Sequence, residues 1–413
     1  MPTLLPEELV KWQFVESQVK QVMNAYAFRE IRTPIVERTE LFQRTIGEST
    51  DVVSKEMYSF KDRKDQSLTL RPEATAGVVR AGIEHGLFYN QTQKLWSMGP
   101  MYRYERPQKG RYRQFHQINM EAFGYRGPEI DLEIILMTAR IWKALGINSI
   151  QLEINSLGTP ASRQVYREAL VDYFTDHKRS LDEDSMTRLK TNPMRILDSK
   201  NPDMKTLILN APKITDYLDD ESKQHFSILL KALESHSIDY KLNPNLVRGL
   251  DYYTKTVFEW TSDQLGSQAT VCGGGRYDGL VEQLGGKDIC GIGCAIGMER
   301  LTELVELSVE KAENSQPKIY IVAVGEGAEI HASIMAETIR DENQNYAVEV
   351  NMDGGSFKQQ FRRADKSGAE LAIIVGEQEI EQGTVSLKPL KSDGEQKTVK
   401  QEELIGQLDK FFG

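Results

Sequence analysis

The sequence contains no stretch of about 20 consecutive apolar residues, the length that a membrane-spanning helix requires. Its N-terminus also lacks the long apolar core of a secretory signal peptide. Cysteine is scarce, with 3 residues in a chain of 413, and shows no pairing pattern of the kind that stabilises small secreted domains. These absences argue against a membrane-spanning or secreted protein and favour a location in the reducing cytoplasm.

Several catalytic and cofactor-binding patterns are missing as well. No Ser/His/Asp or Cys/His arrangement typical of hydrolases is present, and the 6 histidines are scattered. Cys272, Cys290 and Cys294 match no zinc-binding spacing, so we expect buried, reduced thiols and no metal site made by protein ligands. The glycine-rich segment at residues 273–277 has neither the Walker spacing nor the dinucleotide fingerprint, so it indicates phosphate binding only weakly.

The net charge of −10 argues mildly against nucleic-acid binding, but a global sum does not exclude a local basic patch. The best candidate for contact with an RNA backbone is the predicted helix at residues 356–366. Lys358, Arg362 and Lys366 recur there every four residues and share one face, with Arg363 beside them. Taken alone, such a cluster more often forms a solvated helix face.

The chain is long enough for two or three domains of about 150 residues each. Residues 160–242 consist of charge-rich helical segments broken before prolines, which predicts a helical insertion. Beyond Pro317, strand-like and helical runs alternate, which predicts a doubly wound α/β domain with at least partly parallel strands. We therefore expect one domain over residues 1–315 and a second over residues 316–413.

Apolar periodicity predicts the main elements of the first domain. The expected helices span residues 6–27, 73–85 and 128–145, and another begins near residue 297. The expected strands include residues 251–260, 268–272 and 291–296, with a glycine-rich turn at residues 273–275.

Two strand-like runs flank residues 106–111, a polar connection with a proline and a glycine, which predicts a hairpin. On the returning strand, alternation of side chains places Arg113, Gln117 and Glu121 on one face and apolar residues on the other. Arg103 and Glu105 are expected beside them, on the outgoing strand. This polar face is either open to water or the lining of a site.

The density of arginine favours a site. Arg103, Arg111 and Arg113, with Arg106 and Lys109, would repel one another unless an anion lay between them. Guanidinium groups grip phosphate oxygens bidentately, so a polyphosphate is the first candidate ligand and an RNA backbone the second.

Two further arginines stand where a side chain can reach a cleft. Arg248 precedes a glycine at the start of a β-branched and aromatic run, where the pattern alone favours a core strand with the arginine as a surface cap. Arg300 falls in the first turn of a predicted helix, where the helix N-terminus and the guanidinium together favour a phosphate. A solvated arginine is the alternative interpretation of Arg300.

Taken together, these segments resemble histidyl-tRNA synthetase, a class II aminoacyl-tRNA synthetase, over nearly the whole chain and in the family's order. Residues 29–60 resemble the dimer-interface signature of the class. Met101-Tyr-Arg103-Tyr-Glu105-Arg-Pro-Gln-Lys-Gly-Arg111-Tyr-Arg113 matches the second signature and Gly297-Met-Glu-Arg300-Leu the third, and these alone indicate adenylate formation. Arg248-Gly-Leu-Asp-Tyr-Tyr253 and Gly273-Gly-Gly-Arg-Tyr277-Asp-Gly are specific to the histidine enzymes.

The resemblance implies an α+β catalytic domain with the antiparallel sheet of the class II synthetase fold, interrupted by the helical insertion. A C-terminal α/β anticodon-binding domain follows. It also implies a cytoplasmic homodimer that uses ATP and Mg²⁺. Such an enzyme activates L-histidine to histidyl-adenylate, releases pyrophosphate and transfers histidine to the 3′ end of its tRNA.

The resemblance also assigns residues to ATP and to catalysis. Arg103 would hold the α-phosphate, and Arg111 and Arg300 the outer phosphates, with Glu105 and Arg113 also at the ATP. Arg248 would contact both the substrate carboxylate and the α-phosphate, which makes Arg248 and Arg103 the catalytic residues.

Further residues are assigned in the same way to histidine. Glu73 and Thr75 would bind the α-amino group, and Gln117 would orient the amino acid. Glu121 and Tyr253 would recognise the imidazole ring, with Tyr252 in the same pocket. For the tRNA, the basic cluster with Lys358, Arg362 and Arg363 remains the candidate contact.

The sequence departs from the family in two places. Met1-Pro-Thr precedes the Leu-Pro-Glu-Glu stretch where a longer segment with an Arg-Gly motif is usual. Either one N-terminal strand of the family is missing or the start is misplaced, and a missing strand is expected to weaken activity or dimer packing. Ala74 stands where glycine is common, beside the expected amino-group site, and we expect its methyl group to be tolerated.

Two rival interpretations follow from the same residues. A catalytically inactive, histidine-sensing regulatory paralogue would resemble the synthetase core but would lack the C-terminal domain and the ATP-binding arginines, both of which this chain keeps. A class II synthetase for another amino acid is disfavoured by residues 248–253.

Overall fold

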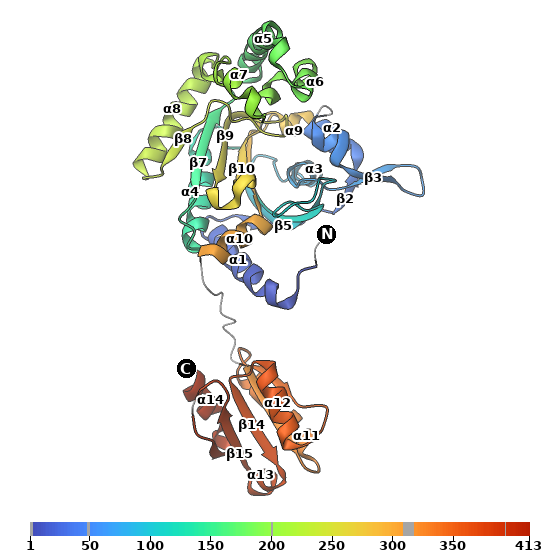
Figure 1. Cartoon of the computed structure of the whole chain (residues 1–413), viewed down its shortest axis with the longest axis vertical. Helices are drawn as coiled ribbons and strands as arrows, with labels where there is room; N and C mark the ends of the chain where they lie inside the picture. Colours follow the sequence, from blue (N-terminus) through green and yellow to red (C-terminus); the bar gives the residue numbers. More distant parts are fainter. Residues whose placement is uncertain (1–2, 48–49, 200, 309–317, 393) are drawn as a thin grey trace. The chain divides into compact units, whose positions relative to one another are not determined.

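In a computed structural model the chain forms two compact units, Met1–Ala312 and Glu313–Gly413. The structure describes residues 3–47, 50–199, 201–308, 318–392 and 394–413 (Figure 1). The domain boundary that the sequence predicts after residue 315 lies outside the described residues. None of the described helices combines the length and apolar character that crossing a membrane requires.

The first unit is built on a mixed eight-stranded sheet in the order β1-β5-β6-β11-β10-β9-β7-β8. Its six central strands are antiparallel to their neighbours, whereas β1 pairs with β5 and β8 with β7 in parallel. The antiparallel sheet expected from the sequence therefore forms, with one short parallel strand added at each edge. In that order the strands are Arg29–Glu30, Gln93–Tyr102, Gln114–Phe123, Gly291–Gly297, Thr270–Arg276, Thr254–Thr261, Gln151–Ser156 and Tyr240–Leu242.

One face of this sheet is covered by α1 (Pro6–Ala25), α4 (Glu129–Ala144) and α10 (Met298–Ser308), whose apolar side chains form one continuous core with it. Strand β6 sends Ile118, Met120 and Ala122 into that core. The alternation of a strand then turns Gln117, Asn119 and Glu121 to the opposite face. The sequence therefore predicted correctly which of these side chains lie on each face of the strand.

The opposite face is bordered by two smaller groups of elements. A three-stranded antiparallel sheet, in the order β2-β4-β3, is formed by Val36–Arg38, Ser67–Leu70 and Tyr58–Lys61. The helices α2, α3 and α9 near it are Thr39–Ile46, Thr75–Glu84 and Leu280–Gln283.

The described part of the expected insertion at residues 160–242 consists of helices joined by short connections, and its last three residues form β8. Its last helix packs into the core beside α4 through Phe226, Leu229 and Leu233, and its earlier helices join a second core with Tyr277 and Val281. The helices α5, α6, α7 and α8 are Pro160–Asp176, Glu183–Thr191, Lys205–Leu209 and Asp220–Ser235 (Figure 1, green).

Two expectations from the sequence are wrong in detail. Arg103 and Glu105 do not lie on the outgoing strand, because β5 ends at Tyr102 and both residues belong to the connection to β6. Residues 273–275 form no turn, because they lie within the central strand β10. Glycine is required there by close approach: a Cβ on Gly274 would lie 2.2 Å from the carbonyl oxygen of Gly293.

The second unit contains a five-stranded sheet in the order β13-β12-β14-β15-β16. The first three strands are parallel to their neighbours and the last two antiparallel, so the predicted partly parallel α/β domain is confirmed. The strands are Ala347–Val350, Lys318–Val324, Leu371–Gly376, Thr384–Pro389 and Lys397–Lys400. The helices α11, α12, α13 and α14 are Ala328–Glu342, Phe357–Ser367, Glu377–Gln382 and Leu404–Phe412.

Candidate active site

A cavity of about 930 Å³ opens on the sheet face opposite α1, α4 and α10. Its wall combines the ends of β6, β10 and β11 with the connection after β5, the segment before β9 and part of the helical insertion. The cavity-lining residues expected from the sequence are Glu73, Thr75, Arg103, Glu105, Arg111, Gln117, Arg248, Tyr252, Tyr253 and Arg300.

Two expected site residues do not line the cavity. Glu121 lies one layer behind the wall, where it is 2% exposed. Arg113 turns away, with its guanidinium carbon 3.9 Å from the centre of the Tyr104 ring and its Nε donating to the carbonyl of Glu105. The hairpin therefore brings Arg103, Arg111 and Gln117 into one site but not Arg113.

Glu121 is connected to the cavity through two hydroxyl groups. The Oγ1 of Thr75 donates to its Oε1 at 2.7 Å, and the hydroxyl of Tyr277 donates to its Oε2. Burial raises the pKa of the Glu121 carboxyl to about 8, against the two hydroxyl donors, and the charge of Glu73 adds to the rise. The Glu121 carboxyl at this corner of the cavity therefore gains or loses its proton near neutral pH.

Glu73 sits at the start of α3 and accepts the backbone N–H groups of Thr75 at 2.7 Å and Ala76 at 2.9 Å. Burial raises its pKa, while these donors and the positive charge of Arg103 oppose the rise. Ala74, between Glu73 and Thr75, has φ of −102°, a conformation open to any residue. The backbone therefore imposes no requirement for glycine at this position.

Three tyrosines close the same corner. The ring of Tyr252 lies 4.6 Å from that of Tyr253 and 5.6 Å from that of Tyr277, measured between ring centres. Burial raises the pKa of all three hydroxyls, so they stay protonated and available as hydrogen-bond donors.

Arg248 stands beside these tyrosines, with its guanidinium 5.9 Å from the centre of the Tyr253 ring. Its Nη1 pairs with Glu259 on β9, which also accepts from Thr270 at 2.9 Å. A Cβ on Gly273 would lie 2.4 Å from Nη2 of Arg248, so the glycine leaves room for the guanidinium. Arg248 therefore projects into the site, which resolves the two alternatives that its sequence context left open.

The other end of the cavity is rich in arginine. Arg103 donates to the carbonyl of Pro72 at 2.8 Å, and Arg300 donates to the carbonyls of Gly110 and Thr270. Arg111 pairs with Glu105. Burial lowers the pKa of Arg300, and the charges of Arg111 and Arg103 lower it further. Like charges this close create a strong preference for an anionic ligand.

Three buried polar atoms on the cavity wall have no hydrogen-bond partner among the described residues. They are the Oε1 of Gln117, the Nδ2 of Asn119 and the Nε of Arg248. An unpaired buried polar atom is costly unless a ligand or water pairs with it. These atoms thus mark where a polar substrate fits between the arginine end and the tyrosine corner.

Sequence reasoning missed three site residues. Tyr277 lies inside a motif recognised from the sequence, and Asn119 shares the strand face of Gln117 and Glu121, so both had a signal. Glu259 had none, because its pairing with Arg248 depends on the turn between them and on Gly273 across the β9–β10 ladder.

The basic cluster of the second unit divides in two. Lys358 and Arg362 are exposed on α12. Arg363 instead donates to Oδ1 of Asn351 at 2.9 Å and to the carbonyl of Gly354 at 2.8 Å, so it fastens the loop before the helix.

The three cysteines, Cys272, Cys290 and Cys294, are free and buried, as expected from their spacing. Among the described residues, no group of three or more His, Cys, Asp or Glu side chains is arranged to hold a metal ion.

The mixed sheet, the cavity on its face and the separate α/β unit are those of a class II aminoacyl-tRNA ligase. Residues 1–301 match the family model for histidyl-tRNA synthetase, and residues 318–411 match that of an anticodon-binding domain. The chain belongs to the histidyl-tRNA synthetase family, as its motifs indicate.

One solved structure supports this assignment, and two more distant ones share the fold. The chain is 38% identical to apo histidyl-tRNA synthetase from S. aureus, with a TM-score of 0.82 over 98% of this chain and 97% of that one. Histidyl-tRNA synthetase from Nostoc sp. PCC 7120 matches at 19% identity and a TM-score of 0.70, over 100% of this chain and 98% of that one. A protein from Bacillus halodurans C, described as an ATP phosphoribosyltransferase regulatory subunit/histidyl-tRNA synthetase, shares the fold at 19% identity and a TM-score of 0.65, over 91% and 96%.

Proposed function

We propose that this protein activates histidine with ATP to form histidyl-adenylate and then transfers histidine to the 3′ end of its tRNA. One observation carries the proposal: a single cavity joins an arginine-rich end to a corner with a buried carboxyl and three tyrosines, and Arg248 stands where it reaches both. The arginine end suits a polyphosphate, and the corner suits a small polar ring.

The first step is an in-line attack of the histidine carboxylate on the α-phosphate of ATP, which forms a C–O–P linkage and expels pyrophosphate. Two anions must approach, so cations and alignment supply most of the rate enhancement. Arg103 holds the α-phosphate, and Arg111 and Arg300 hold the outer phosphates, with Glu105 orienting Arg111. Arg248 bridges the carboxylate and the α-phosphate; its unpaired Nε supplies a donor, and Glu259 fixes the guanidinium plane.

Histidine is selected at the other end of the cavity. Glu73, with Thr75, receives the α-amino group, and Gln117 orients the amino acid through its unpaired Oε1. Glu121 and Tyr253 recognise the imidazole ring, with Tyr252 and Tyr277 completing the pocket. An apolar analogue leaves these buried groups unpaired, which costs about 10⁴-fold in selectivity, so no separate editing site is needed.

In the second step, the terminal ribose hydroxyl of the tRNA attacks the adenylate carbonyl and releases AMP. Mg²⁺ would reach the site bound to the outer phosphates of ATP and would neutralise part of their charge. Lys358 and Arg362 are proposed to contact the tRNA. We also propose that the protein works as a homodimer in the cytoplasm.

ATP–pyrophosphate exchange with each amino acid tests the activation step. We expect exchange with histidine alone, dependent on Mg²⁺ and nearly abolished in Arg248→Ala. Histidine binding without exchange would instead support a non-catalytic histidine sensor. Exchange with a different amino acid would reject the assignment of Glu121 and the tyrosines to imidazole.

A further inference from the structure

Arg276 is a fully buried arginine that the proposed reaction does not use. It is 0% exposed, the last residue of β10 and the immediate neighbour of Tyr277. Burying a guanidinium is unfavourable unless every donor finds an acceptor, so its presence here calls for a specific structural purpose.

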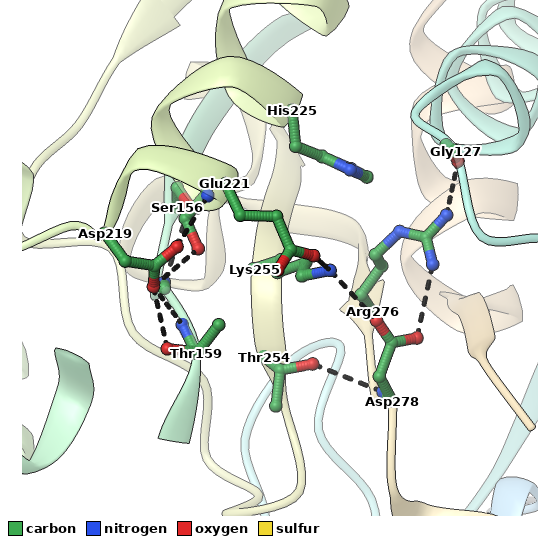
Figure 2. A network of polar contacts seen from close by, with 12 residues as sticks. Gly127, Ser156, Thr159, Asp219, Glu221, His225, Thr254, Lys255, Arg276 and Asp278 are labelled. Atoms are coloured by element: carbon green, nitrogen blue, oxygen red, sulfur yellow. Dashed lines mark hydrogen bonds and ion pairs between the residues drawn. The ribbon is translucent and has the colours of Figure 1, made fainter. Parts of the chain in front are cut away.

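The guanidinium of Arg276 is fully engaged, and its acceptors come from three places. Its Nε donates to Asp131 on α4 at 2.7 Å, and its Nη1 donates to Asp278 at 3.2 Å. The backbone carbonyls of Tyr125, at 3.1 Å from Nη1, and of Gly127 complete the set. Figure 2 shows the side chain reaching from its strand toward Gly127 on one side and Asp278 on the other.

These acceptors lie on both sides of strand β11. Tyr125 and Gly127 belong to the loop that follows β6, whereas Arg276 ends β10, and β11 runs between those two strands. Glu121 is on β6 and Tyr277 follows β10, so their hydrogen bond also crosses β11. Gly291 and Gly293 make the crossing possible: a Cβ would lie 2.3 Å from the Tyr277 ring in the first case and 1.9 Å from the Glu121 carboxylate in the second.

We propose that Arg276 is a positioning residue for amino-acid selection, which sets the Tyr277 hydroxyl against the Glu121 carboxylate by tying the end of β10 to the loop after β6. The inference rests on the proposed function, in which this corner receives the imidazole ring. Arg276 itself does not line the cavity, so it acts through Tyr277.

The groups that hold Arg276 are themselves fixed. Asp131 also accepts from His225 at 2.8 Å and from Thr256 at 2.7 Å. Asp278 accepts the N–H of Gly291 at 3.2 Å, and its own N–H donates to Thr254 at 3.2 Å. Tyr277 is therefore anchored on both sides, by Arg276 before it and by Asp278 after it.

This network extends to the helical insertion. His225 and Glu221 both come from α8, and Glu221 pairs with Lys255 at 2.7 Å, which lies 3.8 Å from Asp278 (Figure 2). We call the part of the cavity around Glu121 and Tyr277 the imidazole corner. It is held in place by the helical insertion as well as by α4.

Lysine cannot replace this arginine. An ammonium group reaches Asp131 as a point charge but lacks the planar fork that serves Asp131, Asp278 and two carbonyls together. We expect Arg276→Lys to raise the KM for histidine about tenfold in ATP–pyrophosphate exchange, the effect of one charge-assisted hydrogen bond. The KM for ATP should stay within about twofold, because the arginine end is untouched.

A double-mutant cycle with Tyr277→Phe distinguishes positioning from general loosening. Because Arg276 acts through the Tyr277 hydroxyl, the double variant should bind histidine about as weakly as either single variant, about tenfold below the parent and not about a hundredfold. Additive losses, or equal changes in the KM for histidine and for ATP, would overturn the inference.

Thr138→Val is the matched structural control. It removes a buried hydrogen bond of 2.8 Å between α4 and Trp260 without touching Tyr277, so it should lower the melting temperature and leave the KM for histidine unchanged. If Arg276→Lys does not fold, Asp278→Asn, which keeps the shape but weakens the same anchor, should raise the KM severalfold and again fail to add to Tyr277→Phe. An additive Asp278→Asn effect would then reject the inference.

Exchange by the unaltered protein distinguishes failure of the proposed function from failure of the role given to Arg276. If it gives no exchange with histidine, the proposed function fails and the inference fails with it. If it exchanges while Arg276→Lys leaves the KM for histidine unchanged, only the inference fails.

Discussion

The hydroxyl of Tyr277 donates a hydrogen bond to the carboxylate of Glu121 across an intervening strand. The two residues are 156 positions apart in the chain and meet only because β11 presents glycines at the crossing. Their contact places a buried carboxyl at the corner of the cavity where substrate selection is proposed.

The buried carboxyl of Glu121 should make folding stability depend on pH. Its pKa rises from a usual 4.5 to about 8 because burial disfavours the charged form. The folded state therefore binds more protons than the unfolded state between these values. The contribution of Glu121 is thus fully present below pH 4.5 and is lost as pH rises toward 8.

Glu121→Gln isolates that contribution, because glutamine keeps the shape and cannot ionise. The parent should lose a few kcal/mol of unfolding free energy between pH 5 and pH 8 that the variant keeps. Each pH unit between the two pKa values costs the parent about 1.4 kcal/mol. Urea titrations at several pH values measure this difference. A difference that stays constant across the range would contradict the assigned pKa.

Gly293→Ala should disrupt the imidazole corner by steric conflict. The new Cβ would lie 1.9 Å from Oε2 of Glu121 and 2.6 Å from the carbonyl oxygen of Met120, and the backbone atom cannot move away cheaply. We expect a loss of about 1–3 kcal/mol in unfolding free energy, measured by denaturant titration. Gly297→Ala, on the same strand with nothing within 4 Å of its Cβ, is the control for stability. Equal stability of the two variants would refute the steric argument.

Arg248 and Glu259 should act as a pair. Arg248→Ala removes a cation from the reacting centre and should slow exchange about 10²-fold or more. Arg248→Lys should restore little, because an ammonium group cannot bridge carboxylate and phosphate with a planar fork. Glu259→Gln keeps the guanidinium but weakens its anchor, so a smaller loss is expected.

The control for this pair is Arg340→Ala in the second unit, whose guanidinium pairs with Glu337 on the surface of α11. It should leave the exchange rate unchanged. Near-normal exchange by Arg248→Ala would remove Arg248 from the catalytic step.

The basic residues on α12 should have two different roles, tRNA binding for Lys358 and Arg362 and structural stability for Arg363. Replacing the exposed Lys358 and Arg362 with alanine should weaken tRNA charging while sparing exchange, and charging should become less sensitive to salt because fewer phosphates are neutralised. Arg363→Ala should instead destabilise the second unit, because it removes the bonds to Asn351 and Gly354. Equal loss of charging and exchange in the double variant would refute its assignment to RNA.

The sequence by itself determined the family, the order of the elements and most of the expected residues that line the cavity. Local sequence patterns were enough where a feature lies within a single strand, helix or motif. Alternation along β6 separated Gln117 and Glu121 from Ile118 and Met120, and the motif around Arg248 indicated histidine. The strand and helix alternation after residue 317 predicted the second unit.

Only the tertiary structure decided how these pieces meet. Arg113 contacts Tyr104 and Glu105, Arg248 pairs with Glu259, and Arg363 binds Asn351 and Gly354. These partners lie close by in the chain, but each contact depends on how the segment between the two residues folds back, which side-chain periodicity does not record. Residues 273–275 lie in strand β10 and not in a turn. Glycine is needed there because a Cβ on Gly274 or Gly275 would meet the adjacent strands and one on Gly273 would meet the Arg248 guanidinium, a constraint that no local pattern records. A run of glycines in the sequence can therefore mean either a turn or a strand in close contact with its neighbours, and only the tertiary packing shows which one forms.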